Sequence, residues 1–265
     1  MERYTHGHHD SVLRSHRWRT IENSAAYLVD RLEPGRSLLD VGCGPGTLTV
    51  DLARRVAPGR VVGVDSVEAI VEQARSDVPD GVANVSFEVG DVYALDFEDG
   101  TFDVVHAHQV LQHLNDPVAA LRAMRRVCRP GGVVAVRDAD YQAMTWYPSN
   151  DRLDRWLALY REVAVANGGH PDAGRYLLHW VHEAGLSQVE ASASTWCFAT
   201  PKEREWWGGL WADRIRQSSF ADHAIETGLA TRSDLDDLAA GWLDWAANPE
   251  SWFTVPHHEL VAEVE

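Results

Sequence analysis

Residues 38–49 read LLDVGCGPGTLT, and this stretch decides the fold. It consists of a short apolar run, an acidic residue within it, three glycines at alternate positions and the beginning of an amphipathic helix. Glycine allows a tight turn with positive φ and lets a ligand lie directly on the backbone, and the helix that follows presents unpaired N–H groups. The stretch therefore predicts a strand, a turn and a helix that together hold a nucleotide-like cofactor.

The glycine spacing separates two kinds of cofactor. The dinucleotide fingerprint is G-x-G-x-x-G, with pyrophosphate at the helix N-terminus. Here the glycines fall at positions 42, 44 and 46, Thr47 follows them, and Asp40 lies near the end of the strand. At this point the sequence resembles the class I S-adenosylmethionine-dependent methyltransferases, whose first motif is acid-x-G-x-G-x-G. An acid that lines the pocket suits their cationic sulfonium better than it suits pyrophosphate.

A second acidic residue ends the next predicted strand. Residues 61–65 form an apolar run that ends in Asp65, and such runs are typical of buried parallel strands. Asp65 lies 25 residues after Asp40, near the position where nucleotide-binding α/β folds hold the ribose diol. Asp65 or Ser66 could instead cap the following helix. We favour the ribose role because of the match to the first motif.

Later segments extend the resemblance. Residues 90–92 read GDV after a third predicted strand, residues 102–117 read FDVVHAHQVLQHLNDP, and residues 125–136 read RRVCRPGGVVAV. With these motifs in this order, about residues 15–140 resemble the quinone-biosynthesis-type branch of the class I methyltransferases. One departure is the HAHQ run at residues 106–109, where this branch usually carries small or hydroxyl residues.

The resemblance implies a set of cofactor ligands. In the family, an acid after the third strand, here Asp91, bonds the adenine amino group, and the N–H of the next residue, here Val92, bonds a ring nitrogen. The residues implied to bind S-adenosyl-L-methionine are Arg19, Asp40, Gly42, Cys43, Gly44, Gly46, Thr47, Asp65, Ser66, Gly90, Asp91, Val92, Ala107, His108 and Gln109.

The implied fold is α/β, with a Rossmann-like, mostly parallel sheet of seven strands in the order 3-2-1-4-5-7-6 and strand 7 antiparallel. Apolar spacing over residues 21–32 predicts a helix, and helical stripes over about residues 201–247 predict a helical insertion between strands 6 and 7. We expect one domain, made of N-terminal lid helices, a cofactor-binding core and a substrate-side half (1–265 as a whole, and 1–35, 36–140 and 141–265 in turn).

Composition excludes several kinds of partner. The chain of 265 residues has a net charge of −16, which repels the phosphate backbone of nucleic acids. We find no apolar run of ~18 residues and therefore expect no membrane span. No secretory signal is readable. Three isolated cysteines without C-x-x-C spacing suit the reducing cytoplasm, and they argue against a structural zinc site (Cys43, Cys128 and Cys197). We expect no metal site, because no regular ligand spacing links the N-terminal histidines (His6, His8, His9 and His16).

The leading hypothesis is methyl transfer from S-adenosylmethionine to a small, largely hydrophobic acceptor, with C-, O- and N-methylation all open. The reaction is an in-line displacement, so it needs proximity, a dry pocket and sometimes a base. His113 is the first candidate base, because histidine titrates near neutrality, and its alternative role is a hydrogen-bonded histidine of a helix cap. Further candidates are His16, Asp138, Asp140 and Tyr141.

Two other functions stay open at this point. One is a protein that binds S-adenosylmethionine without transferring its methyl group, as a scaffold or a catalyst of rearrangement. The other is an NAD-dependent oxidoreductase, which predicts glycine at position 47. A homodimer is also open. Aromatic residues of the C-terminal half should wall an acceptor pocket, or else pack the insertion onto the sheet (Trp146, Tyr147, Trp206, Trp207 and Trp211).

Overall fold

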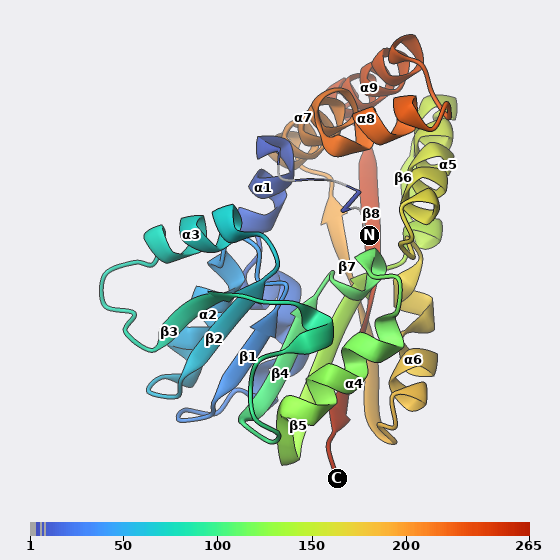
Figure 1. The fold of residues 1–265 in the computed structure, drawn as a ribbon. Helices are drawn as coiled ribbons and strands as arrows, with labels where there is room; N and C mark the ends of the chain where they lie inside the picture. The colour runs from blue at the N-terminus through green and yellow to red at the C-terminus, as the bar shows by residue number, and fades with distance from the viewer. Residues whose placement is uncertain (1–3, 6, 8) are drawn as a thin grey trace.

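The computed structural model describes Tyr4, Thr5, Gly7 and residues 9–265. Within these residues one eight-stranded sheet organises the fold (Figure 1). Its strands are β1 (Leu38–Val41), β2 (Val61–Asp65), β3 (Val85–Val89), β4 (Phe102–His108), β5 (Cys128–Ala139), β6 (Thr145–Tyr147), β7 (Gln188–Phe198) and β8 (Trp252–Glu263).

The strand order confirms the predicted topology. The order is β3-β2-β1-β4-β5-β8, with β7 on the far side of β8, so β8 and β7 are the predicted strands 7 and 6. Strands β1 to β5 pair in parallel, and β8 is antiparallel to both β5 and β7. The prediction missed the short strand β6. Because β8 extends beyond the end of β5, its first residues would lack backbone partners there, and β6 supplies them.

The helical segments alternate with the strands. They are α1 (Asp10–Arg17), η1 (Ile21–Ala25), η2 (Ala26–Arg31), α2 (Thr47–Val56), α3 (Glu68–Ser76), η3 (Val92–Ala94), η4 (Leu111–His113), α4 (Pro117–Val127), η5 (Tyr141–Ala143), α5 (Asp151–Ala166), η6 (Ala173–Tyr176), α6 (Leu177–Glu183), α7 (Pro201–Gln217), α8 (Ser219–Glu226) and α9 (Arg232–Ala247). None of the described helices is long and apolar enough to cross a lipid bilayer.

The single helix predicted over residues 21–32 is wrong. Residues Ile21–Ala25 form a π-helical turn, and Ala26–Arg31 form a 3₁₀ helix. Side chains hold the start of this segment: Asn23 accepts the N–H of Thr20, and Asp51 of α2 accepts the N–H of Ile21 at 2.9 Å. The Asp51 bond anchors the segment to α2. The backbone leaves helical angles at Ala25, with φ −139 and ψ 20, and this break divides the predicted helix in two. Leu28 and Leu32 are nevertheless buried, as the apolar spacing indicates.

The core has two layers because successive strand residues point to opposite faces of the sheet. On one face Leu39 and Val105 pack with α4 and α6, and on the other Leu38 and Val104 pack with α2 and the η1–η2 segment. The strands are therefore covered on both faces, as parallel strands require. Their carboxyl ends remain at one edge of the sheet.

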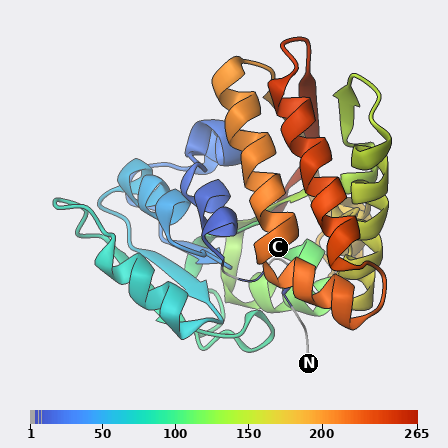
Figure 2. The ribbon, with the colours of Figure 1, turned by 90° about the horizontal axis from the view of Figure 1, so that it is seen from above.

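Helices α7, α8 and α9 form the predicted insertion, between β7 and β8. Figure 1 shows them above the carboxyl ends of the parallel strands, and Figure 2 shows α7 and α9 side by side. An aromatic cluster holds them on α5 and β8, with Trp156, Trp242 and Trp245 fully buried around Phe253. Because each large ring removes ~150–250 Å² from water, this cluster is a second hydrophobic core.

Candidate active site

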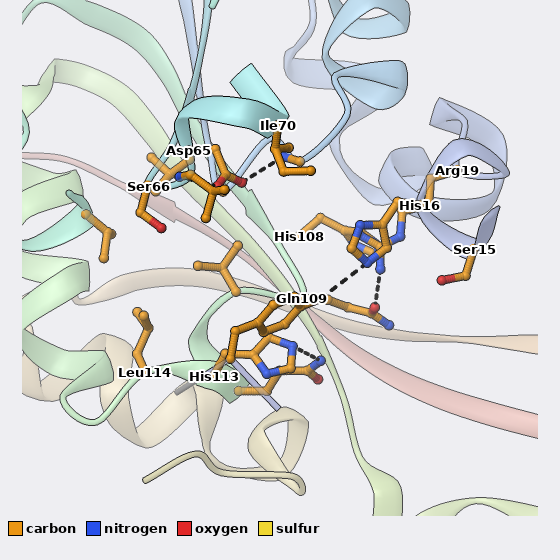
Figure 3. A pocket seen from close by; sticks show the side chains of 18 of the residues that line it. Ser15, His16, Arg19, Asp65, Ser66, Ile70, His108, Gln109, His113 and Leu114 are labelled. Carbon is orange, nitrogen blue, oxygen red and sulfur yellow. Dashed lines mark hydrogen bonds between the residues drawn. The ribbon is translucent and has the colours of Figure 1, made fainter. Parts of the chain in front are cut away.

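A cavity of about 970 Å³ opens at the carboxyl ends of β1, β2, β3 and β4. This volume lies near the top of the roughly 300–1,000 Å³ range of small-molecule sites. One side of its wall comes from the loops that follow the strands, and the other comes from α1 and α7. Figure 3 shows the cavity from close by, with Asp65 and Ser66 on one side and His16, Arg19 and His108 on another.

The glycine turn after β1 forms part of the wall. Gly44 has φ +54 and donates its N–H to Asp65 Oδ2 at 3.0 Å. A Cβ added at Gly44 would meet only His16 Nδ1, at 3.4 Å, so the backbone there is open to a ligand. Gly46 differs: with φ +78, an added Cβ would lie 2.6 Å from Phe87 Cζ. Gly44 thus leaves room for a cofactor, whereas Gly46 allows close packing inside the protein.

Asp65 lies at the end of β2 with its carboxylate at the cavity. Its Oδ2 accepts the N–H of Gly44, and its Oδ1 accepts the N–H of Val67 at 3.1 Å. A carboxylate has about four acceptor sites, so about two remain for a ligand. The N-cap of α3 is Val67, which makes no side-chain cap bond, so the alternative of Asp65 or Ser66 as the N-cap is wrong.

Other predicted cofactor ligands fall into two groups. Those that line the cavity are Arg19, Gly42, Gly44, Asp65, Ser66, Gly90, Asp91, Val92, His108 and Gln109. Those that do not are Asp40, Cys43, Gly46, Thr47 and Ala107. Of these, Asp40, Cys43 and Thr47 face a much smaller space that His16, Arg19 and His108 also line. Ala107 is fully buried in the hydrophobic core.

Asp40 is buried, and its carboxylate is already engaged. Its Oδ1 lies 2.7 Å from His106 Nδ1, and its Oδ2 accepts the hydroxyl of Thr49 at 2.6 Å. His106 is directly opposite Asp40 in the pairing of β1 with β4. The carboxylate of Asp40 therefore does not lie in the wall of the main cavity. Its bond to Thr49 instead joins β1 to α2, the two elements that flank the glycine turn.

A hydrogen-bonded chain fixes the wall next to Gly44. Arg19 Nη2 donates to Gln109 Oε1 at 2.5 Å, Gln109 Nε2 lies 2.7 Å from His257 Nε2, and His257 Nδ1 donates to the Val255 carbonyl. Gln109 has φ 55, a conformation that is uncommon outside glycine and is often found at functional sites. The sequence reasoning missed His257, which lies 148 residues from Gln109.

Two groups in this wall have unused binding capacity. Among the described residues, Arg19 has no carboxylate partner and His108 has no hydrogen bond at either ring nitrogen. His108 is only 4% exposed, and burial, followed by the charges of Arg19 and Arg137, lowers its pKa well below 6.5. A neutral imidazole and a cation beside the glycine turn fit the ammonium and carboxylate groups, respectively, of a methionine tail. The described residues thus fit S-adenosylmethionine.

His113 lies in the cavity wall but is poorly suited to act as a base. Its Nε2 lies 3.0 Å from Gln112 Nε2, and its ring meets the Tyr4 ring edge-on at 4.7 Å. Burial, followed by the charges of Arg19 and Arg214, lowers the pKa of His113 to about 3. A base with that pKa binds a proton weakly at neutral pH. His113 is therefore a neutral hydrogen-bonding group.

The other candidate bases differ in position. His16 and Tyr141 line the cavity, and Asp138 and Asp140 do not. Asp138 is fully buried and accepts the N–H of Gln112, and burial raises its pKa to about 7. Asp140 forms two hydrogen bonds with Arg175, at 2.7 and 2.8 Å.

The aromatic wall is only partly the predicted one. Trp207 and Trp211 line the cavity, but both are nearly fully buried, so they also pack the insertion. Trp146 stacks on Phe253, Tyr147 is half exposed, and Trp206 packs against Trp18 and Phe198. The sequence reasoning did not include the wall residues Tyr4, Met144, Trp196 and Arg214. Arg214 could have been found, because it follows Trp207 and Trp211 at helical spacing.

No group of three or more His, Cys, Asp or Glu side chains suited to a metal occurs in the described part of the chain. His6 and His8, two of the four N-terminal histidines, lie outside the described residues.

Comparison with known proteins identifies the family. Residues 32–185 match the family described as "Methyltransferase domain". The chain is 34% identical to an uncharacterized methyltransferase of Schizosaccharomyces pombe, over 99% of this chain and 96% of that protein. It is 28% identical to a 2-methyl-6-phytyl-1,4-hydroquinone methyltransferase of Synechocystis, over 74% of this chain and 60% of that protein. The chain therefore belongs to the methyltransferase domain family.

The family assignment confirms the resemblance found in the sequence. The chain is an S-adenosyl-L-methionine-dependent methyltransferase by class, and the NAD-dependent alternative is not supported. A solved [4+2]-cyclase, SpnF, shares the fold with a TM-score of 0.55 and 21% identity, over 90% of this chain and 81% of that one. Because fold does not determine reaction, the acceptor has to be argued from the site itself.

Proposed function

We propose that this protein transfers the methyl group of S-adenosylmethionine to a small, largely hydrophobic acceptor that binds beneath α7. The observation that supports this proposal is the continuity of the cavity. Its wall runs from Gly44 in the glycine turn, with Asp65 beside it, to Trp207 and Trp211 of the insertion. Tyr141 of η5 lines the same cavity. One cavity with a polar end and an aromatic end has room for a cofactor and an apolar acceptor side by side.

The residues divide the work of binding. Asp65 holds the ribose diol, Asp91 and Val92 hold the adenine, and Arg19 binds the carboxylate of the methionine tail. S-adenosylmethionine supplies an electrophilic methyl group on its sulfonium. The aromatic end, with Met144 among its wall residues, orients the acceptor and keeps water away from the reacting atoms, which is the main requirement of an in-line displacement.

The test is a methylation assay with isotope-labelled S-adenosylmethionine. The purified protein is incubated with a panel of phenols, quinols, aromatic amines and unsaturated acids, and labelled products are identified by mass spectrometry. We expect labelled product together with S-adenosylhomocysteine, and no product with the Asp65→Ala variant at low cofactor concentration. Tight cofactor binding without any methylated product, over the panel and over cell extracts, would contradict the proposal and favour a non-transferring protein.

A further inference from the structure

Arg214 of α7 is a buried cation at the aromatic end of the cavity. It is only 4% exposed, and it lies in the wall together with Tyr141 and Trp211. Its Cζ lies 4.5 Å from the centre of the Trp211 ring, a cation–π contact that fixes the orientation of the guanidinium. Its Nη2 donates to the Ser15 hydroxyl at 3.0 Å and to the Ser11 carbonyl at 3.3 Å.

Within the described residues, no carboxylate neutralises this charge. The neighbouring acid, Asp213, pairs with Arg14 at 2.5 Å instead. Arg214 Nε is buried without a hydrogen-bond partner, and Nη1 has none among the described residues. Among the described residues, Arg137 and Arg204 are also buried: Arg137 forms an ion pair with Glu259 at 2.9 Å, and Arg204, which bonds the Ala199 carbonyl, lies outside the cavity wall. Burying an arginine without a counter-ion is costly, so its retention in a cavity wall points to an anionic ligand.

The contacts of Arg19 and Arg214 indicate that the two arginines bind different ligands. Arg19 bonds Gln109, which directly follows β4, the strand that pairs with β1 before the glycine turn. Arg214 instead bonds Ser11 and Ser15 of α1. The cofactor has one carboxylate, and Arg19, unlike Arg214, also lines the smaller space beside Gly42 and Cys43 of the glycine turn. Arg214 is therefore left for the second ligand.

We propose that Arg214 binds a carboxylate of the acceptor, so that the acceptor is an amphipathic acid with an aromatic or unsaturated apolar body. This inference rests on the proposed function, since it assigns the aromatic end of the cavity to the acceptor. The apolar body packs against Trp207, Trp211 and Met144. The guanidinium then supplies Nη1 as a charge-assisted hydrogen-bond donor to the carboxylate.

The experiment measures binding and needs no turnover. Calorimetry with saturating S-adenosylhomocysteine compares 2-naphthoate with 2-naphthamide, which have the same shape and differ in charge. We expect the wild type to prefer the naphthoate by about tenfold or more, the range of a charge-assisted hydrogen bond. Arg214→Met should abolish the preference and leave the affinity for S-adenosylhomocysteine unchanged. Arg14→Met, which removes a nearby and partly exposed charge, should retain the preference, and Arg214→Lys should retain part of it.

Two results would overturn the inference. One is equal affinity for the two probes, or no naphthoate binding, in the wild type, a comparison that requires no variant to fold. The other is an equal loss of S-adenosylhomocysteine binding in Arg214→Met, which would place the cofactor carboxylate at Arg214. If the charge preference depends on Arg214 but no methyl transfer is ever found, the proposed function fails and the ligand class stands. If methyl transfer occurs on neutral acceptors alone, the proposed function stands and the inference of an acidic acceptor fails.

Discussion

Replacing Asp65 with alanine should weaken S-adenosylmethionine binding by about tenfold to a hundredfold while the chain stays folded. The Asp65 carboxylate has about four acceptor sites, of which the N–H groups of Gly44 and Val67 take two. The remaining pair matches the two hydroxyls of a ribose. A hydrogen bond to a charged group contributes about 1.5–3 kcal/mol, and 1.4 kcal/mol is about a factor of ten in affinity.

The same geometry sets the cost to stability. Asp65→Ala leaves the N–H groups of Gly44 and Val67 without their partner, but both lie at the edge of a cavity that water can enter. We expect a loss of about 1–2 kcal/mol in the free energy of unfolding, which a protein with a stability of about 5–15 kcal/mol tolerates.

Calorimetry with S-adenosylmethionine and urea unfolding measure the two effects separately. Glu68→Gln is the matched control, because it removes an exposed carboxylate in the first turn of α3, outside the cavity wall. It should leave the affinity unchanged. An unchanged affinity in folded Asp65→Ala would refute the ribose assignment and with it the orientation of the cofactor.

Three further predictions concern the pair Gly44 and Gly46, the side chain of His113 and that of Asp138. Gly44→Ala should cost about 1–2 kcal/mol of stability through its left-handed backbone but lose cofactor binding, whereas Gly46→Ala should cost about 2–4 kcal/mol through its overlap with Phe87; urea unfolding and calorimetry distinguish them. His113 has a folded pKa of about 3 against 6.5 unfolded, so the unfolded chain binds the extra proton between these values and stability falls as pH drops below about 6.5. His113→Gln should flatten that decline, by up to about 1.4 kcal/mol per pH unit, and should leave the shape of the pH–rate profile between about pH 6 and 9 unchanged. Asp138, with a folded pKa of about 7, acts in the opposite sense: the folded chain binds the extra proton between about pH 4 and 7, so stability falls as pH rises. The free energy of unfolding of Asp138→Asn should therefore rise relative to that of the wild type as the pH increases over this range, which unfolding measurements check.

The strands and the glycine turn of the cofactor-binding half could be predicted because short stretches of sequence define them. An apolar run that ends in an acid marks the end of a strand, so β2 ends at Asp65 and β3 leads into Asp91 as predicted. Alternate glycines define a turn without help from distant residues. The fold could therefore be predicted from short stretches in their order.

The partners of these residues could not be predicted in the same way. Asp40 is the acid of the first motif, yet its carboxylate is hydrogen-bonded to His106 on the neighbouring strand. Gln109 is held by His257, which lies 148 residues further along the chain. Such contacts depend on sheet register and on the packing of the insertion, and no local pattern encodes them. The HAHQ run at residues 106–109 differs from the usual sequence of the resembled branch and so drew attention to this region, but it did not indicate which residues these side chains contact.

Helix α1 connects the two ends of the cavity, and this position gives it a distinct physical character. Val12 is its only fully buried apolar side chain, so hydrophobic burial contributes little to its placement. Polar contacts hold it instead: Ser15 accepts a hydrogen bond from Arg214, and the chain continues directly to Arg19. Both arginines line the cavity, and we propose that each binds an anionic group, Arg19 that of the cofactor and Arg214 that of the acceptor. On this proposal we expect the two ligands to be coupled through α1, so that saturating S-adenosylhomocysteine strengthens the binding of the acid and, by reciprocity, the acid strengthens the binding of the cofactor.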